Sequence, residues 1–85
     1  MQEDRVTRLK RLQMRSMRRG IKEMDILLSA FAQANLARMD DARLDLYDAL
    51  LHENDQDLYQ WVTGQAVPDE QFRDLISDIA QTYQK

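Results

Sequence analysis

Apolar residues recur at the spacing of an α-helix along almost the whole chain, and this periodicity constrains the fold more than any other feature. It is clearest near the C-terminus, where apolar residues stand three, four and seven positions apart: Phe72, Leu75, Ile76, Ile79, Ala80 and Tyr83. There are few β-branched residues, no period-two alternation and no hairpin dipeptide. The pattern therefore predicts an all-α fold.

Breaks in the periodicity divide the chain into about five helices, which make a small single-domain bundle. Gly20 separates the first two, because a residue free to adopt a positive φ can end one helix and let another begin. Asp40 or Asp41 is expected to cap the third helix and Asp55 the fourth, which Gly64 ends. The expected helices cover roughly residues 4–18, 21–37, 40–52, 55–63 and 69–83.

The chain has 85 residues, enough for one domain spanning 1–85 but too few to enclose a large cofactor together with catalytic machinery. It has no cysteine, which excludes disulfides, thiolate metal sites and cysteine nucleophiles. His52 is the only histidine, and no Glu-x-x-His pair occurs, so no metal centre is predicted. No serine has an activating context and no glycine-rich phosphate loop is present. We therefore expect no catalytic residues and a module that acts on another protein.

The first ten residues, MQEDRVTRLK, carry no sign of a targeting segment. They lack the apolar centre of a secretory signal, and Glu3 and Asp4, with no serine before Ser16, argue against a transit peptide. No apolar run approaches the ~20 residues that span a bilayer, so membrane insertion is not expected. These features predict a cytosolic protein.

Charge is distributed unevenly along the chain, whose net charge is −3. Eight basic residues precede residue 23 against two acids, whereas thirteen acids and four basic residues follow. This asymmetry predicts an oriented field that steers docking to a partner. Four arginines stand in a stripe at helical spacing and could bind phosphates: Arg8, Arg11, Arg15 and Arg18. A helical nucleic-acid-binding module is therefore an alternative. The acidic remainder, and the lack of aromatic residues within the stripe, argue against that alternative.

The stretch RRGIKEMD, residues 18–25, places two acids beside the expected joint between the first two helices. Glu23 and Asp25 stand at i, i+2 and point in different directions, so they cannot share one proton or one metal ion. One interpretation is purely structural. Asp25 then stabilises the helix dipole or pairs with Arg18 or Arg19, and Glu23 forms a surface ion pair with Arg19 worth about 0.5 kcal/mol.

This stretch has the pattern RRGxxExD, and two further patterns follow it, Asp55-x-Asp57-Leu58 and Trp61-x-x-Gly64. In this order and spacing the chain resembles the succinate dehydrogenase assembly factors, also called flavinators, in their free-standing bacterial form. The resemblance runs from about residue 11 to about residue 79.

The resemblance implies that the protein binds the flavoprotein subunit of succinate dehydrogenase, or of fumarate reductase in some bacteria. There it promotes covalent attachment of FAD to a histidine of that subunit, here called the client. It implies a chaperone-like factor, not an enzyme, that binds no cofactor stably and acts on the FAD of the client. We expect a monomer without nucleic acid, and an antitoxin-type protein is a further alternative. The implied partner-binding residues are Arg18, Arg19, Gly20, Glu23 and Asp25; any cofactor-binding residues are unknown.

Overall fold

The computed structural model describes residues 3–83, and all regular structure in this part of the chain is helical. The α-helices are α1 (Arg5–Arg15), α2 (Lys22–Asn35), α3 (Asp41–Leu50), α4 (Asp55–Val62) and α5 (Arg73–Tyr83). Two short 3-10 segments, Leu36–Arg38 and Glu70–Phe72, follow α2 and precede α5. The prediction of an all-α fold of about five helices is confirmed. No helix within residues 3–83 has the length and apolar character needed to cross a membrane.

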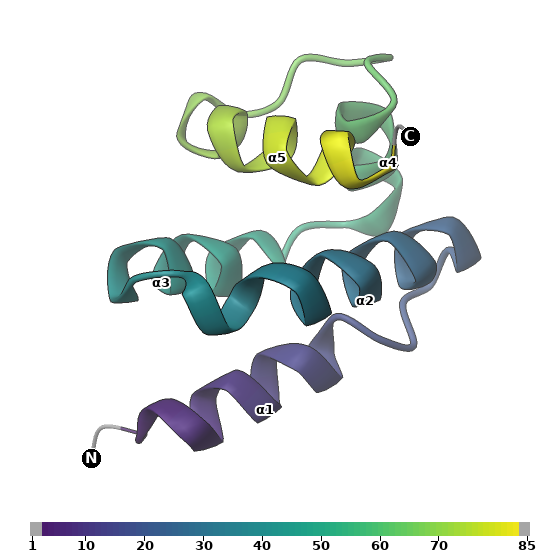
Figure 1. Ribbon diagram of the computed structural model, residues 1–85. Coiled ribbons are helices and arrows are strands. Elements are labelled where there is room, and N and C mark those ends of the chain that lie inside the picture. The colour runs from purple at the N-terminus through teal and green to yellow at the C-terminus, as the bar shows by residue number, and fades with distance from the viewer. Residues whose placement is uncertain (1–2, 84–85) are drawn as a thin grey trace.

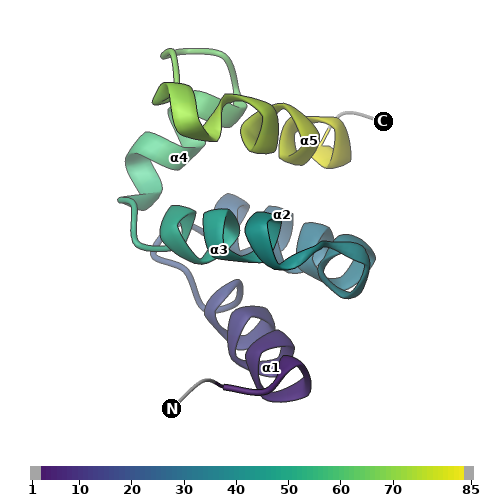
Figure 2. The same ribbon diagram turned by 90° about the vertical axis from the view of Figure 1, so that its left-hand side faces the viewer.

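The helices lie in three layers, with α2 and α3 in the middle layer (Figure 1). The helix α1 lies on one side of this layer and α4 and α5 on the other, and the view turned by 90° shows the same order (Figure 2). The central element is α2, because it contacts α1, α4 and α5.

The core is built from the apolar faces that the periodicity predicts. Side chains from every helix are fully or almost fully buried there, among them Leu12, Met24, Leu28, Phe31, Leu44, Tyr47, Leu58, Phe72, Leu75 and Ile79. The rings of Phe31 and Tyr47 lie 5.7 Å apart between centroids and join α2 to α3. In contrast, α1 contributes only Leu12 as a fully buried apolar residue. Other interactions must therefore hold α1 in place.

The helix α1 ends at Arg15, before the expected end near residue 18. The Ser16 hydroxyl donates a 2.8 Å hydrogen bond to the Leu12 carbonyl, and the backbone of Arg18 enters the left-handed region with φ 57°. A left-handed residue cannot continue a right-handed helix. The predicted positive φ at Gly20 is wrong, because Arg18 adopts this conformation instead.

The helix caps follow the sequence in two of three cases. The Asp40 carboxylate accepts a hydrogen bond from the first turn of α3, and Gly64, with φ 81°, follows the end of α4, as predicted. The predicted cap of α4 is wrong, because Asn54 performs this role through a 2.7 Å hydrogen bond from the Gln56 amide. The Asp55 carboxylate is instead directed at the connection between α1 and α2.

Candidate functional site

The five predicted partner-binding residues lie on the connection between α1 and α2 and on the first turn of α2. They differ in how far they reach the surface. Arg18, Gly20 and Glu23 are exposed, and Asp25 is half-buried. Arg19 is turned inward, with 12% of its side chain exposed. Three of the five residues are therefore open to solvent, whereas Arg19 faces the fold.

The Arg19 guanidinium joins the α1–α2 connection to the start of α4. Its Nε donates to Asp55 Oδ1 at 2.8 Å, and Nη2 forms an ion pair with the same oxygen at 2.7 Å. Nη1 donates to the carbonyls of Arg15 and Leu51 at 3.1 and 3.2 Å, and Nη2 donates to that of Glu53 at 3.4 Å. A half-buried, charge-assisted pair with further hydrogen bonds is much stronger than an exposed ion pair.

The second carboxylate oxygen of Asp55 holds the backbone of the same connection. The Gly20 N–H donates to Asp55 Oδ2 at 2.6 Å. A Cβ atom added to Gly20 would lie 3.2 Å from this oxygen, which is closer than an ordinary van der Waals contact. Glycine is therefore favoured here by the close approach of a carboxylate and not by a positive φ.

Arg18 is presented to solvent in an unusual backbone conformation. A φ of 57° is uncommon for a residue with a side chain and costs on the order of 1–3 kcal/mol. Its side chain makes no hydrogen bond or ion pair with the residues that the structure describes. Strained backbone conformations cluster at functional sites, which makes Arg18 a candidate.

Glu23 and Asp25 have separate surroundings, as their spacing predicts. Both stand in the first turn of α2, where carboxylates favour the positive end of the helix dipole. Asp25 Oδ1 lies 3.4 Å from the Ser29 hydroxyl, which is also 3.3 Å from the Ser16 carbonyl. The ion pairs expected from Asp25 and Glu23 to the neighbouring arginines are wrong, because Arg19 binds Asp55 instead.

Two exposed apolar side chains accompany the motif. Met17 is 45% exposed, and Ile26, one helical turn after Glu23, is 62% exposed. Ile26 falls outside the helical positions of the buried residues of α2, so its place in the apolar pattern could have identified it as a surface residue. We call Met17, Arg18, Gly20, Glu23 and Ile26 the docking surface.

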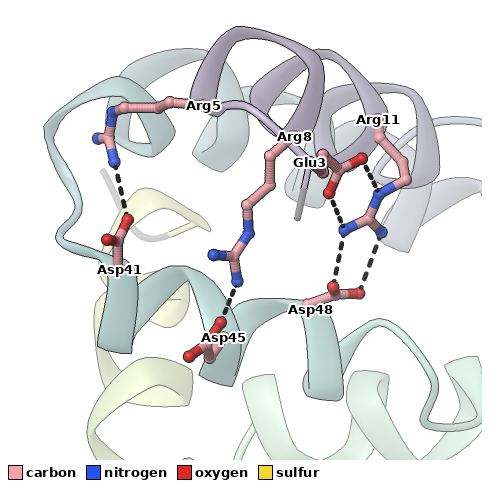
Figure 3. Close-up of a pocket in the computed structure, with 7 residues that line it drawn as sticks. All are labelled: Glu3, Arg5, Arg8, Arg11, Asp41, Asp45 and Asp48. Atoms are coloured by element: carbon pink, nitrogen blue, oxygen red, sulfur yellow. Dashed lines mark hydrogen bonds and ion pairs between the residues drawn. The ribbon is translucent and has the colours of Figure 1, made fainter. Parts of the chain in front are cut away.

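A second group of charged side chains connects α1 to α3, and Figure 3 shows three arginines of α1 pointing at three aspartates of α3. We call the group the Arg–Asp ladder: Arg5–Asp41 at 3.4 Å, Arg8–Asp45, Arg11–Asp48 at 2.9 Å and Arg15–Asp48 at 2.8 Å. Its register shows that α1 and α3 run parallel. Hydrogen bonds from Arg11 hold the pKa of Asp48 below its usual value of 3.8.

The Arg–Asp ladder changes the interpretation of the charge asymmetry. The basic N-terminal segment lies against the acidic residues of α3, so the two charges neutralise each other within the fold. The cleft between α1 and α3 is lined by three arginines and four carboxylates: Arg5, Arg8, Arg11, Glu3, Asp41, Asp45 and Asp48. These pairs reduce the separation of charge that the sequence suggests, and the oriented field stays a prediction. Three of the four arginines of the proposed phosphate-binding stripe, Arg8, Arg11 and Arg15, are already paired.

These features define a class: a small all-α protein with a strained, hydrogen-bonded connection between its first two helices. Within residues 3–83 no cluster of three or more histidine, cysteine or acidic side chains is arranged to hold a metal ion.

The chain belongs to the family described as flavinator of succinate dehydrogenase, because the sequence model of that family matches residues 10–83. It is 48% identical over 64 residues to a protein of Aspergillus terreus and 49% identical over 61 residues to one of Meyerozyma guilliermondii. A protein of Candida glabrata is 55% identical over 53 residues. Each of the three is named succinate dehydrogenase assembly factor 2, mitochondrial.

The alignments cover 75%, 72% and 62% of this chain but 22%, 45% and 35% of the respective relatives. The chain thus spans less than half the length of these relatives. The family prediction is confirmed, whereas these relatives are fungal and not of the bacterial type. The prediction of a cytosolic location is wrong on this comparison, because the relatives' names point to the mitochondrion. That prediction rested on the composition of residues 1–10, which overlaps the family match by a single residue.

Proposed function

We propose that this protein binds the flavoprotein subunit of succinate dehydrogenase and promotes covalent attachment of FAD to that subunit. The observation that supports this most is the match of residues 10–83 to the flavinator family. The names of the relatives as assembly factors support it further. In this proposal the flavin bond forms on the client, and this chain contributes binding and no catalytic group.

The docking surface is the part of the fold that suits such a client. It combines exposed apolar side chains, Met17 and Ile26, with the free charges of Arg18 and Glu23. Methionine and arginine are favoured at protein interfaces, because one adapts its shape and the other makes several hydrogen bonds. We propose that this surface holds the client in an arrangement that brings its flavin and its acceptor histidine together.

The arginines that line the cleft and hold the α1–α2 connection are not free to bind FAD as a resident cofactor. A pyrophosphate needs uncommitted positive charge or a free helix N-terminus. Arg5, Arg8, Arg11, Arg15 and Arg19 are all paired with carboxylates, and the cleft between α1 and α3 holds more acids than arginines. We therefore propose that the FAD belongs to the client. Titration of FAD with the purified protein should leave the flavin fluorescence unchanged.

The proposal is tested by mixing purified client lacking FAD with FAD, with and without this protein. Covalent flavin is read as fluorescence of the client after denaturing electrophoresis, and it should increase with the protein present. Arg18→Glu should reduce the increase, because it reverses the exposed charge of the docking surface. Arg73→Glu is the matched control, since Arg73 is an exposed arginine at the start of α5, outside the docking surface. Equal flavinylation with and without the wild-type protein would contradict the proposal.

A further inference from the structure

Asp55 is the first residue of α4, yet both of its carboxylate oxygens are used by the α1–α2 connection. One oxygen binds the Arg19 guanidinium at 2.7–2.8 Å, and the other accepts from the Gly20 N–H at 2.6 Å. Only 16% of the Asp55 side chain is exposed. A single side chain thus fixes two consecutive residues that lie 36 and 35 positions away in sequence.

The other end of the connection is fixed as well. The Ser16 hydroxyl is buried, 2.8 Å from the Leu12 carbonyl and 2.5 Å from the Tyr47 hydroxyl. Between Ser16 and Arg19 stand only two residues, one of which is Arg18 with its left-handed backbone. A segment this short, anchored at both ends, has few conformations available. The anchors therefore impose the strained conformation of Arg18.

Asp55 is not needed for the start of its own helix. Asn54 provides the cap of α4, and Asp57 supplies a second acid in the first turn. The arrangement therefore assigns to the Asp55 carboxylate a different task from capping.

We infer that Asp55 is a positioning residue: it holds the α1–α2 connection in the shape in which Arg18 and Gly20 meet the client. This inference rests on the proposed function and adds to it a residue outside the RRGxxExD pattern. A surface that is already ordered binds with a smaller loss of entropy than one that must become ordered on contact. The α3–α4 junction thereby takes part in client binding without touching the client.

The first experiment compares Asp55→Ala and the isosteric Asp55→Asn with the matched control Asp57→Ala. Asp57 is an exposed acid in the same turn of α4, so its removal reproduces the loss of charge but leaves the connection intact. Client affinity should fall about tenfold in both Asp55 variants and stay unchanged in the control. Far-ultraviolet circular dichroism should show that all three variants keep their helices. Client affinity equal to that of the wild type in both Asp55 variants would overturn the inference.

The second experiment is a double-mutant cycle between Gly20→Ala and Asp55→Ala, read as client affinity. In the wild-type background the new methyl group would lie 3.2 Å from Asp55 Oδ2 and should weaken binding. In the Asp55→Ala background that oxygen is absent, so Gly20→Ala should cause little further loss. An equal loss in both backgrounds would show that Gly20→Ala does not act through Asp55 and would overturn the inference.

A third measurement does not involve the client. The amide proton resonance of Gly20 should move upfield in Asp55→Ala and exchange faster with solvent, because a 2.6 Å hydrogen bond is lost. If wild-type protein fails to bind the client, the proposed function fails. This measurement still tests the clamp, by which we mean the bonds of Arg19 and Gly20 to Asp55. If the client binds but the Gly20 resonance is unchanged in Asp55→Ala, the inference alone is overturned.

Discussion

Arg11 of α1 binds Asp48 of α3 through two hydrogen bonds, of 2.9 Å to Oδ2 and 3.3 Å to Oδ1. Arg15 reaches the same carboxylate at 2.8 Å. Since α1 places only Leu12 fully in the core among its apolar residues, these bonds are a main attachment of α1 to the rest of the fold.

Acid should therefore destabilise the protein through Asp48. Its pKa is lowered in the folded state, mainly by hydrogen bonds from Arg11. A lowered pKa contributes stability that is present above the ordinary value of 3.8 and is lost as the pH falls through the folded-state pKa. Urea unfolding should show a lower free energy of unfolding at about pH 3 than at about pH 7. Asp48→Asn should narrow this difference, and an undiminished difference would contradict the role of Asp48.

Alkali should destabilise the protein through Tyr47. Burial raises its pKa to about 12, against an ordinary value of 10.0. The neutral phenol is thus favoured in the folded state, so its contribution is complete below pH 10 and is lost as the pH rises towards 12. Tyr47→Phe should lower the free energy of unfolding by about 1 kcal/mol at neutral pH, because the hydrogen bond to Ser16 is lost. The free energy of unfolding of this variant should fall less in alkali than that of the wild type. Tyrosinate absorbance during titration should show a late-ionising component in the wild type that is missing in the variant.

Glu23→Ala should weaken client binding with little effect on stability. Glu23 is exposed and stands in the first turn of α2, where an acid stabilises a helix by about 0.3–1 kcal/mol. Client affinity is measured by calorimetry and the free energy of unfolding by urea. Glu70→Ala, which removes an exposed carboxylate from the 3-10 segment before α5, is the control. If Glu23→Ala leaves both affinity and flavinylation unchanged, Glu23 serves only the start of the helix.

Gly20→Arg should abolish covalent flavin on the client while leaving helicity largely intact. The first atom of the new side chain would approach Asp55 Oδ2 to 3.2 Å, and the remainder would cover the docking surface. Helicity should persist because Gly20 lies outside both α1 and α2. Circular dichroism and flavin fluorescence of the client measure the two effects. A normally flavinylated client in the presence of this variant would exclude Gly20 from the interface.

Local signals in the sequence predicted most of the fold. The apolar periodicity placed five helices, and the cap at Asp40 and the break at Gly64 depend on residues close in sequence. The site was predicted less completely, because its decisive contacts are distant in sequence. Nothing near Arg19 indicates that its guanidinium binds Asp55, so a neighbouring acid, Glu23, was the natural expectation.

The positive φ was predicted at Gly20 and occurs at Arg18, again because contacts distant in sequence decide the conformation. Glycine adopts a positive φ more easily than any other residue, so intrinsic preference favoured Gly20. In the fold Gly20 is held by a hydrogen bond to Asp55, and the positive φ stands at Arg18 instead. The spacing of the arginines in α1 likewise predicted that they share one face of a helix. It did not predict that their partners are aspartates of α3.

The clamp at Asp55 means that RRGxxExD is a conformational motif and not a linear one. A synthetic peptide of residues 16–26 would contain every letter of the pattern but neither the carboxylate that holds Gly20 nor the phenol that holds Ser16. Transplanting the stretch onto another helical hairpin would meet the same obstacle. A designed mimic of this surface would need to carry the first turn of α4 along with it.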